Sequence, residues 1–337
     1  MLKKFDDEWS RGRREKDKED MKLPKFILDY KRIIQSQAYS RLAHKSQLLC
    51  PPETRDIRTT EDHTKEVIEI STTISKALGL NTHLCRAIAA AHDIGHGPYR
   101  HLGEVVFSEL NGEHKPFSHL VFGVVVAQEI DRLNLNYETL EGVLFHSRKD
   151  GKIIPPAGKP QEYAGVMYAD KLAFTSSDLD DAIQYGYLTP EEIPADINEL
   201  GPDRETRVKT CIDALVEESK EKGYVSFSQG RIFEVFNGLR SFLYENVYSR
   251  VDFSSHKDVL RKAHKFFSEN PEFKGIDPVV ILALLTDKEL QELETQMLSA
   301  TIKPNIDKIS HFGVFKMLPF LKEVDYSVAD LSWGKEK

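Results

Sequence analysis

Apolar residues recur at helical spacing along most of the chain. In HTKEVIEISTTISKALGL they favour one face, and Gly79 is suited to end that helix. HLCRAIAAAHD is short and very apolar, which predicts a helix deep in the core, and YAGVMYADKLAFTSSDLDDAI is a buried helix that carries acidic residues. We therefore predict an all-α protein, with VSFS near residue 225 as a short candidate strand.

Charge and loop signals divide the chain into three parts. Residues 1–25 are dense in charges of both signs, which is typical of a solvated arm or a surface helix. Helical patterns continue from residue 26, interrupted where glycine and proline occur in DGKIIPPAGKPQEY and YLTPEEIPADINELGPD. We expect a helical core over residues 26–250 and a C-terminal helical extension over residues 251–337 that packs on the core.

Composition narrows the functional classes. A net charge of −8 counts against a dedicated nucleic-acid binder, yet it allows an anionic small substrate, because a pocket can be locally positive. The widely spaced Cys50, Cys85 and Cys211 are typical of reduced thiols in an intracellular protein. The chain shows neither a signal-peptide pattern nor an apolar run long enough to span a bilayer, so we expect a cytoplasmic location and no membrane partner.

Candidate chemistry is concentrated in residues 89–104, which read AAAHDIGHGPYRHLGE. The adjacent pair His92–Asp93 at a helix end offers imidazole and carboxylate, a donor set that suits transition metals. Such a pair is common by chance, but His63 precedes it on an amphipathic helix and Asp170 follows on a buried one. Taken singly, each residue has a structural interpretation as a cap, a core histidine or the partner of a buried cation. Together, on three helices, they predict a metal site.

These residues lie within longer blocks that resemble a known family. RIIQSQAYSRLAHKSQLL, HDIGHGPYRHLGE, YADKLAFTSSDLDDA and LRSFLYENVY are similar, in this order, to segments of the HD-domain deoxynucleoside triphosphate triphosphohydrolases, the dGTPase-like group. The blocks span roughly residues 30 to 250, and neither end of the chain matches. The resemblance implies an HD-domain helical fold over the core, with additional C-terminal helices.

The resemblance also implies a role for each matching residue. One divalent cation would be bound by His63, His92, Asp93 and Asp170, with Mn, Mg, Fe, Co, Ni and Zn all open. The catalytic residues beside it would be His96, His101, Glu104 and His119, with His114 as a competitor for the last position. Sugar, phosphate and base contacts would come from Gln47, Lys171, Asp178, Arg240 and Tyr248.

Two positions depart from the family pattern. Thr60 stands where the family has an arginine that helps to bind phosphate or base, and Arg58 is a candidate to compensate as a substrate contact. Phe174 stands where the family has a tyrosine, so one hydroxyl contact to the nucleotide is missing. Neither change affects the expected metal ligands.

The expected function is metal-dependent hydrolysis of a deoxynucleoside triphosphate, dGTP or a broader range, to deoxynucleoside and inorganic triphosphate by attack at the α-phosphorus. An HD-type phosphohydrolase acting on a monophosphate, a cyclic dinucleotide or guanosine tetraphosphate stays open as an alternative, as does a catalytically idle nucleotide-binding regulator. The resemblance implies a homo-oligomer (dimer, tetramer or hexamer) and leaves an allosteric nucleotide open, while nucleic-acid binding is not indicated.

Overall fold

The computed structural model describes residues 2–16, 23–47, 58–110, 115–147, 157–250, 252–299 and 306–334. Within these ranges the regular structure is helical, and β pairing is limited to two isolated bridges, which confirms the predicted all-α class. The chain divides into two compact units that alternate along the sequence. Unit 1 comprises residues 1–31, 62–92 and 136–251, and unit 2 comprises residues 32–61, 93–135 and 252–337.

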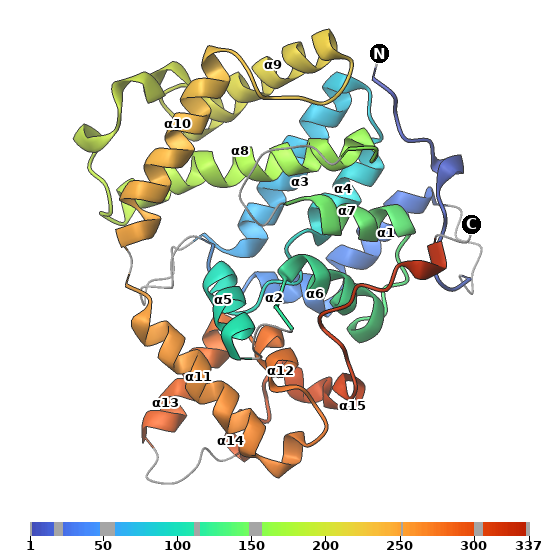
Figure 1. The fold of residues 1–337 in the computed structure, drawn as a ribbon, viewed down its shortest axis with the longest axis vertical. Helices are drawn as coiled ribbons and strands as arrows, with labels where there is room; N and C mark the ends of the chain where they lie inside the picture. Colours follow the sequence, from blue (N-terminus) through green and yellow to red (C-terminus); the bar gives the residue numbers. More distant parts are fainter. Residues whose placement is uncertain are drawn as a thin grey trace. The chain divides into compact units, whose positions relative to one another are not determined.

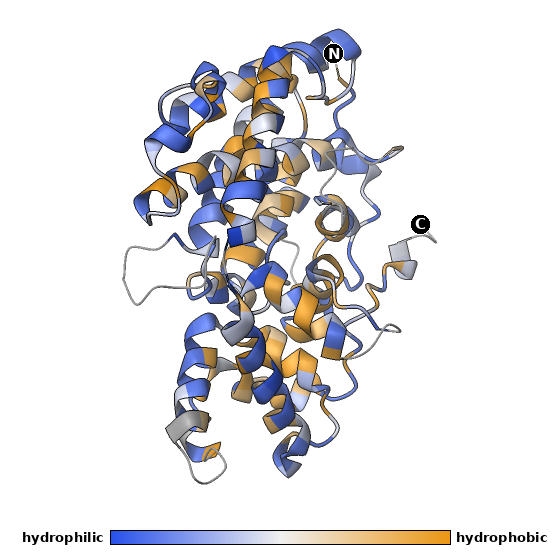
Figure 2. Cartoon of the chain, turned by 60° about the vertical axis from the view of Figure 1, so that its left-hand side comes forward, coloured by the Kyte–Doolittle hydropathy of each residue, from blue (hydrophilic) through white to orange (hydrophobic). Residues whose placement is uncertain are grey.

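The helices follow the apolar periodicity of the sequence, and apolar and polar residues lie on different sides of the same helices (Figure 2). Unit 1 holds most of α1 (Lys25–Ile34) and α3 (Thr60–Leu78), with α4 (Thr82–Ala91), α7 (Tyr137–Phe145), α8 (Gln161–Gln184), α9 (Arg204–Lys222) and α10 (Arg231–Asn246). Unit 2 holds α2 (Gln37–Leu42), α5 (Arg100–Leu110), α6 (His119–Val125), α11 (Ser254–Glu269), α12 (Pro278–Leu284), α13 (Asp287–Ser299), α14 (Ile306–Ile309) and α15 (Leu318–Leu321). The sequence-based divisions after residues 25 and 250 stay predictions.

The core of unit 1 is built around α4 and α8, as the apolar runs of the sequence predict. Helix α4 contacts both α7 and α8, and α8 in turn contacts α9 and α10 (Figure 1). Close packing of α4 on α7 depends on Gly142, because a Cβ at this position would lie 2.3 Å from the Cδ1 of Ile88. The helix that carries Asp170 is therefore held on several sides before any ligand is considered.

Buried carboxylates attach residues 2–16 to unit 1. The backbone N–H groups of Phe5 and Asn81 both donate to Glu162 Oε1, at 2.9 and 2.8 Å. Arg13 forms an ion pair with the fully buried Asp29, with 2.6 Å between Nη2 and Oδ1. Phe5 and Arg13, from the charge-rich start of the chain, thus bind to buried carboxylates of unit 1.

The candidate strand near residue 225 does not form. The N–H of Ser226 donates to Ser219 Oγ at 2.9 Å, and the N–H of Ser228 donates to Glu218 Oε2, also at 2.9 Å. Side chains of α9 therefore accept the hydrogen bonds that a neighbouring strand would otherwise accept. Val225 and Phe227 are buried in this irregular segment, and Ser226 between them is buried too.

In unit 2, Asp287 at the start of α13 accepts hydrogen bonds from two loops, one at Ser46 and one at Tyr99. Its Oδ2 accepts hydrogen bonds from the N–H and the Oγ of Ser46, at 2.8 and 2.7 Å, and its Oδ1 accepts one from the N–H of Tyr99, at 3.0 Å. Tyr99 and Arg100 have φ angles of 59° and 48°, which non-glycine residues rarely adopt. The Asp287 contact helps to hold this turn, which begins α5 and positions His101.

Among the residues that the structure describes, we find no helix with both the length and the apolar character needed to cross a membrane.

Candidate active site

Three predicted metal ligands of unit 1 meet in its interior. His63 lies on α3, His92 directly follows α4, and Asp170 lies on α8. The Nε2 of His63 is 3.1 Å from Asp170 Oδ1 and 3.4 Å from His92 Nε2, while His92 Nε2 is 3.9 Å from the same carboxylate oxygen. Both histidines are fully buried. Two consecutive helices, α3 and α4, and the later helix α8 thus bring two imidazoles and one carboxylate together.

The tautomer of His92 suits metal binding. Its Nδ1 lies 2.7 Å from the carbonyl oxygen of Ala89, a contact in which Nδ1–H donates, so Nε2 keeps a lone pair on the side of His63 and Asp170. A backbone hydrogen bond of this kind on the remote ring nitrogen is the usual way in which metal-binding histidines are oriented. The donor set and this orientation both fit a divalent transition-metal ion.

Asp170 is held in its ionised form. Burial by itself raises the pKa of this carboxyl, but the Lys171 ammonium and the hydrogen bond from His63 outweigh it and hold the pKa well below its usual range. The Nζ of Lys171 lies 3.0 Å from Asp170 Oδ2. An anionic oxygen is thereby available as a ligand at neutral pH.

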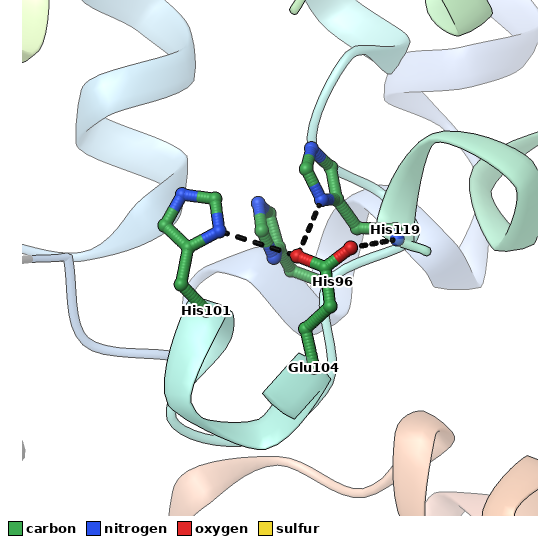
Figure 3. A group of neighbouring side chains, drawn as sticks. All are labelled: His96, His101, Glu104 and His119. Carbon is green, nitrogen blue, oxygen red and sulfur yellow. Dashed lines mark hydrogen bonds and ion pairs between the residues drawn. The ribbon is translucent and has the colours of Figure 1, made fainter. Parts of the chain in front are cut away.

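Unit 2 gathers a second set of predicted residues, His96, His101, Glu104 and His119 (Figure 3). Glu104 Oε2 is 3.3 Å from His101 Nδ1 and 3.0 Å from His119 Nδ1, and Glu104 Oε1 accepts a hydrogen bond from the His119 N–H at 3.1 Å. His96 stacks on His119 with 3.8 Å between ring centroids. Burial raises the pKa of Glu104, but the hydrogen bonds to His101 and His119 outweigh it and hold the pKa far below its usual range.

Gly95 sets the position of His96 beside α6. A Cβ on Gly95 would lie 2.1 Å from the carbonyl oxygen of His119 and 2.3 Å from the nitrogen of Gly123, so only glycine fits this approach of two backbones. His96 and His119 are buried, whereas 70% of the His101 side chain is exposed. The cluster thus has a fixed buried side and one solvent-accessible histidine.

Asp93, the fourth predicted ligand, directly follows His92 in the chain and belongs to unit 2. Its Oδ1 lies 3.3 Å from His96 Nε2, and its Oδ2 lies 2.9 Å from Arg100 Nη2. Arg100 was not among the residues singled out from the sequence, although it stands inside the HDIGHGPYRHLGE block. It also donates hydrogen bonds to Gln47 Oε1 and, at 3.4 Å, to Thr60 Oγ1, the position where the family pattern has an arginine.

Of the predicted substrate contacts in unit 1, two meet directly. Tyr248 donates its hydroxyl hydrogen to Asp178 Oδ2 at 2.6 Å, so the start of the 3₁₀ turn after α10 is joined to α8. Lys171 is bound to Asp170 and lies 5.2 Å from the ring centroid of Phe174. Arg240 lies on α10, where burial lowers the pKa of its guanidinium.

The remaining predicted contacts belong to unit 2. The N–H of Gln47 donates to the carbonyl oxygen of Arg58 at 3.1 Å, which places these two residues side by side. The competitor His114 lies outside the described residues. The buried Lys45 donates to the carbonyl oxygen of His96 and so supports the loop beneath the histidine cluster.

One buried histidine of unit 1 was also not singled out from the sequence. The ring of His146 lies 5.1 Å from that of His92, in an edge-on arrangement, and its Nδ1 is 2.7 Å from the carbonyl oxygen of Val143. The available signal was its place at the end of an apolar helix, in GVLFH, which is the same pattern as AAAH at His92.

Residues 60–175 match the family described as HD domain. A crystal structure of a hypothetical protein from Aquifex aeolicus aligns with 83% of this chain and 70% of its own, at 19% identity and a TM-score of 0.49, too weak a similarity to support an argument. Several curated relatives carry the name deoxyguanosinetriphosphate triphosphohydrolase-like protein. The one from Desulfatibacillum aliphaticivorans is 36% identical over 73% of this chain and 74% of its own length, and the one from Clostridium tetani is 35% identical over 78% and 80%.

The relative from Caldanaerobacter subterraneus subsp. tengcongensis is 38% identical over 271 residues, which cover 77% of both chains. The aligned length exceeds the blocks that carry the sequence resemblance, and the similarity extends over most of both proteins. The chain therefore belongs to the family of deoxyguanosinetriphosphate triphosphohydrolase-like proteins.

Proposed function

We propose that this protein hydrolyses a deoxynucleoside triphosphate to the deoxynucleoside and inorganic triphosphate, by attack of water on the α-phosphorus. The observation that carries the proposal is the convergence of His63, His92 and Asp170 in a chain of this family. Asp93 is proposed as the fourth ligand because it directly follows His92. A triphosphohydrolase acting on dGTP or on a broader set of deoxynucleotides agrees with the name that the relatives carry.

When bound, a divalent cation supplies a Lewis acid that polarises a phosphoryl oxygen and lowers the pKa of water. His92 presents an unprotonated Nε2 for such an ion, the imidazole of His63 lies beside it, and Asp170 presents an anionic oxygen. Manganese, magnesium, iron, cobalt, nickel and zinc all remain candidates, because imidazole and carboxylate donors accept each of them. Lys171 brings a positive charge next to Asp170, suited to offset charge on the triphosphate.

A proton has to reach the departing 5′-oxygen, because an alkoxide is a poor leaving group. We assign this step to His101 or His119, whose ring nitrogens both contact Glu104. The ionised Glu104 orients the rings and stabilises an imidazolium, which can then donate its proton. Imidazole is suited to the task because its ordinary pKa is close to neutral pH.

Recognition of the sugar is assigned to the pair Asp178 and Tyr248 and to Gln47. A carboxylate that already accepts one hydroxyl at 2.6 Å can accept a second from a sugar 3′-hydroxyl, since each carboxylate oxygen has two lone pairs. Arg240 on α10 and Arg58 supply guanidinium groups, which suit phosphate. Arg100 also supplies a guanidinium beside Thr60, where the family arginine is missing.

The decisive test is a product assay. Metal-loaded protein is incubated separately with the four deoxynucleoside and the four ribonucleoside triphosphates, and nucleosides, mono- and diphosphates and inorganic triphosphate are resolved by chromatography. We expect deoxynucleoside and triphosphate in equal amounts, from one or more deoxynucleotides. Formation of a monophosphate with diphosphate would contradict cleavage of the bond between the 5′-oxygen and the α-phosphorus, and no turnover of any triphosphate would overturn the proposal.

A further inference from the structure

We propose that His101, Glu104 and His119, completed by His96, form a second divalent-cation site that lies entirely in unit 2 and suits zinc or cobalt. The inference deepens the proposed function and rests on it only where it concerns turnover. Each of the four residues offers one ligand atom, and these atoms all lie within 4.8 Å of one another. Three imidazoles and one carboxylate are a common donor set for a four-coordinate transition metal.

Three of the four donors already converge. The Nδ1 atoms of His101 and His119 lie 3.3 and 3.0 Å from the same oxygen of Glu104, and their rings are inclined by 74° (Figure 3). The two nitrogens therefore approach that oxygen in different ring planes, as ligands around an ion do. Metal–ligand bonds of about 2.0–2.2 Å can replace these hydrogen bonds with small shifts of the side chains.

His96 supplies the independent observation that points to a ligand. It is 1% exposed, and its Nδ1 has no hydrogen-bond partner among the described residues, while its Nε2 lies 3.3 Å from Asp93. A buried ring nitrogen without a partner costs free energy, which coordination to an ion would recover. Its ring is inclined by only 13° to that of His119, so one of the two rings must tilt before both can bind one ion. His96 is therefore the last ligand to bind.

The surroundings suit an ion that exchanges with solvent. The His101 side chain is 70% exposed, so an ion can enter from that side. The position of Glu104 relative to His119 is fixed, because Glu104 Oε1 accepts a hydrogen bond from the His119 N–H. Because Glu104 and His119 are fixed and His101 is open to solvent, we expect the ion to bind reversibly and more weakly than at a fully enclosed site.

Occupation of this site has a consequence for catalysis. The imidazoles that would bind the ion are those to which the proposed function assigns proton delivery. An imidazole that coordinates a metal through Nδ1 cannot also carry a proton there, so it cannot become the imidazolium that delivers the proton. A first equivalent of metal should therefore activate the enzyme, and a second equivalent should inhibit it.

The test uses the metal-free full-length protein titrated with Co²⁺, with bound metal counted by mass spectrometry and coordination followed by visible absorption. We expect two equivalents in the wild type. His101→Ala and Glu104→Gln should weaken only the second, by more than about 100-fold, and His63→Ala should weaken only the first. His83→Ala is the matched control, because His83 is an exposed histidine on α4 and should leave both equivalents unchanged.

Each outcome decides the inference. A single equivalent in the wild type would overturn it, as would a second equivalent of unchanged affinity in both His101→Ala and Glu104→Gln. Since His101 is exposed, its variant tests the site even where Glu104→Gln fails to fold. Two equivalents without hydrolysis of any triphosphate would remove the proposed function and leave the cation site standing. Full activity when both equivalents of metal are bound would overturn the expected inhibition by the second equivalent.

Discussion

The Nε2 of His63 lies 3.1 Å from Oδ1 of Asp170, although 107 residues separate them in the chain. A buried imidazole and a buried carboxylate cost free energy unless each has a polar partner. Here His92 also contacts His63, and Lys171 also contacts Asp170. The packing of α3, α4 and α8 in unit 1 therefore brings the distant Asp170 together in space with two histidines of consecutive helices.

Replacement of Asp170 by asparagine should remove the anionic ligand and leave the shape of the side chain. We expect affinity for the first metal equivalent to fall by more than about 100-fold, and turnover to fall with it. Metal content after dialysis and the rate of product formation measure the two effects. Glu69→Gln, which neutralises an exposed carboxylate on α3, is the control and should change neither. Full metal retention in Asp170→Asn would remove Asp170 from the ligand set.

The hydrogen bond from Tyr248 to Asp178 should matter for substrate binding more than for the chemical step. Tyr248→Phe removes the 2.6 Å hydrogen bond to a carboxylate, at an expected cost of about 1.5–3 kcal/mol in the free energy of unfolding. Because Asp178 is then less well oriented, we expect KM for the deoxynucleotide to rise several-fold with a smaller change in kcat. Tyr244→Phe serves as control, since Tyr244 lies on α10, four residues before Tyr248, and is 53% exposed. A drop in kcat alone would assign Tyr248 a different role.

Glu218 should make the free energy of unfolding depend on pH in the acidic range. Burial raises the pKa of this carboxyl, but Lys222, Ser226 and Ser228 outweigh it and lower the pKa to about 2. A lowered folded-state pKa contributes stability above the ordinary value of 4.5, and this contribution is lost as pH falls from there towards 2. Glu218→Gln should therefore be less stable than wild type at neutral pH, and the difference should shrink with acidification. Urea unfolding at pH 6 and pH 3 measures it.

The control for this pair of measurements is Glu217→Gln, which alters an exposed carboxylate one position earlier on α9. We expect its stability to follow that of the wild type at both pH values. A constant difference between Glu218→Gln and wild type would show that the hydrogen bonds, and not the charge, hold the segment after α9.

A methyl group at Gly95 should disrupt unit 2. Gly95→Ala places a Cβ within 2.1 Å of the His119 carbonyl oxygen, and because the neighbour is backbone, the loop and α6 must separate. We expect a loss of about 1–3 kcal/mol in the free energy of unfolding and loss of the second metal equivalent, since His96 moves away from His119. Gly238→Ala is the matched control. Its Cβ would meet nothing within 4 Å, and alanine favours the helix by about 1 kcal/mol.

Several features could be predicted from the sequence because they depend on local pattern. Helix positions follow from apolar periodicity, and the all-α class is confirmed. The combination of His63, His92 and Asp170 stood out because such residues are unusual on apolar helices, and the structure brings the three together. The VSFS strand was wrong because an alternating pattern does not show which groups accept the backbone hydrogen bonds of the segment. Here Ser219 and Glu218 on α9 accept those of Ser226 and Ser228.

By itself, the sequence determined that the chain is helical and which side chains carry its chemistry, since helical periodicity and motif spacing are properties of neighbouring residues. Only the tertiary structure decided which of these side chains touch. The hydrogen bond of Arg100 to Gln47, the position of His146 beside His92 and the contact of Tyr248 with Asp178 all join separate segments. Such contacts depend on how helix faces pack and on close approaches such as that at Gly95, and no local pattern encodes them.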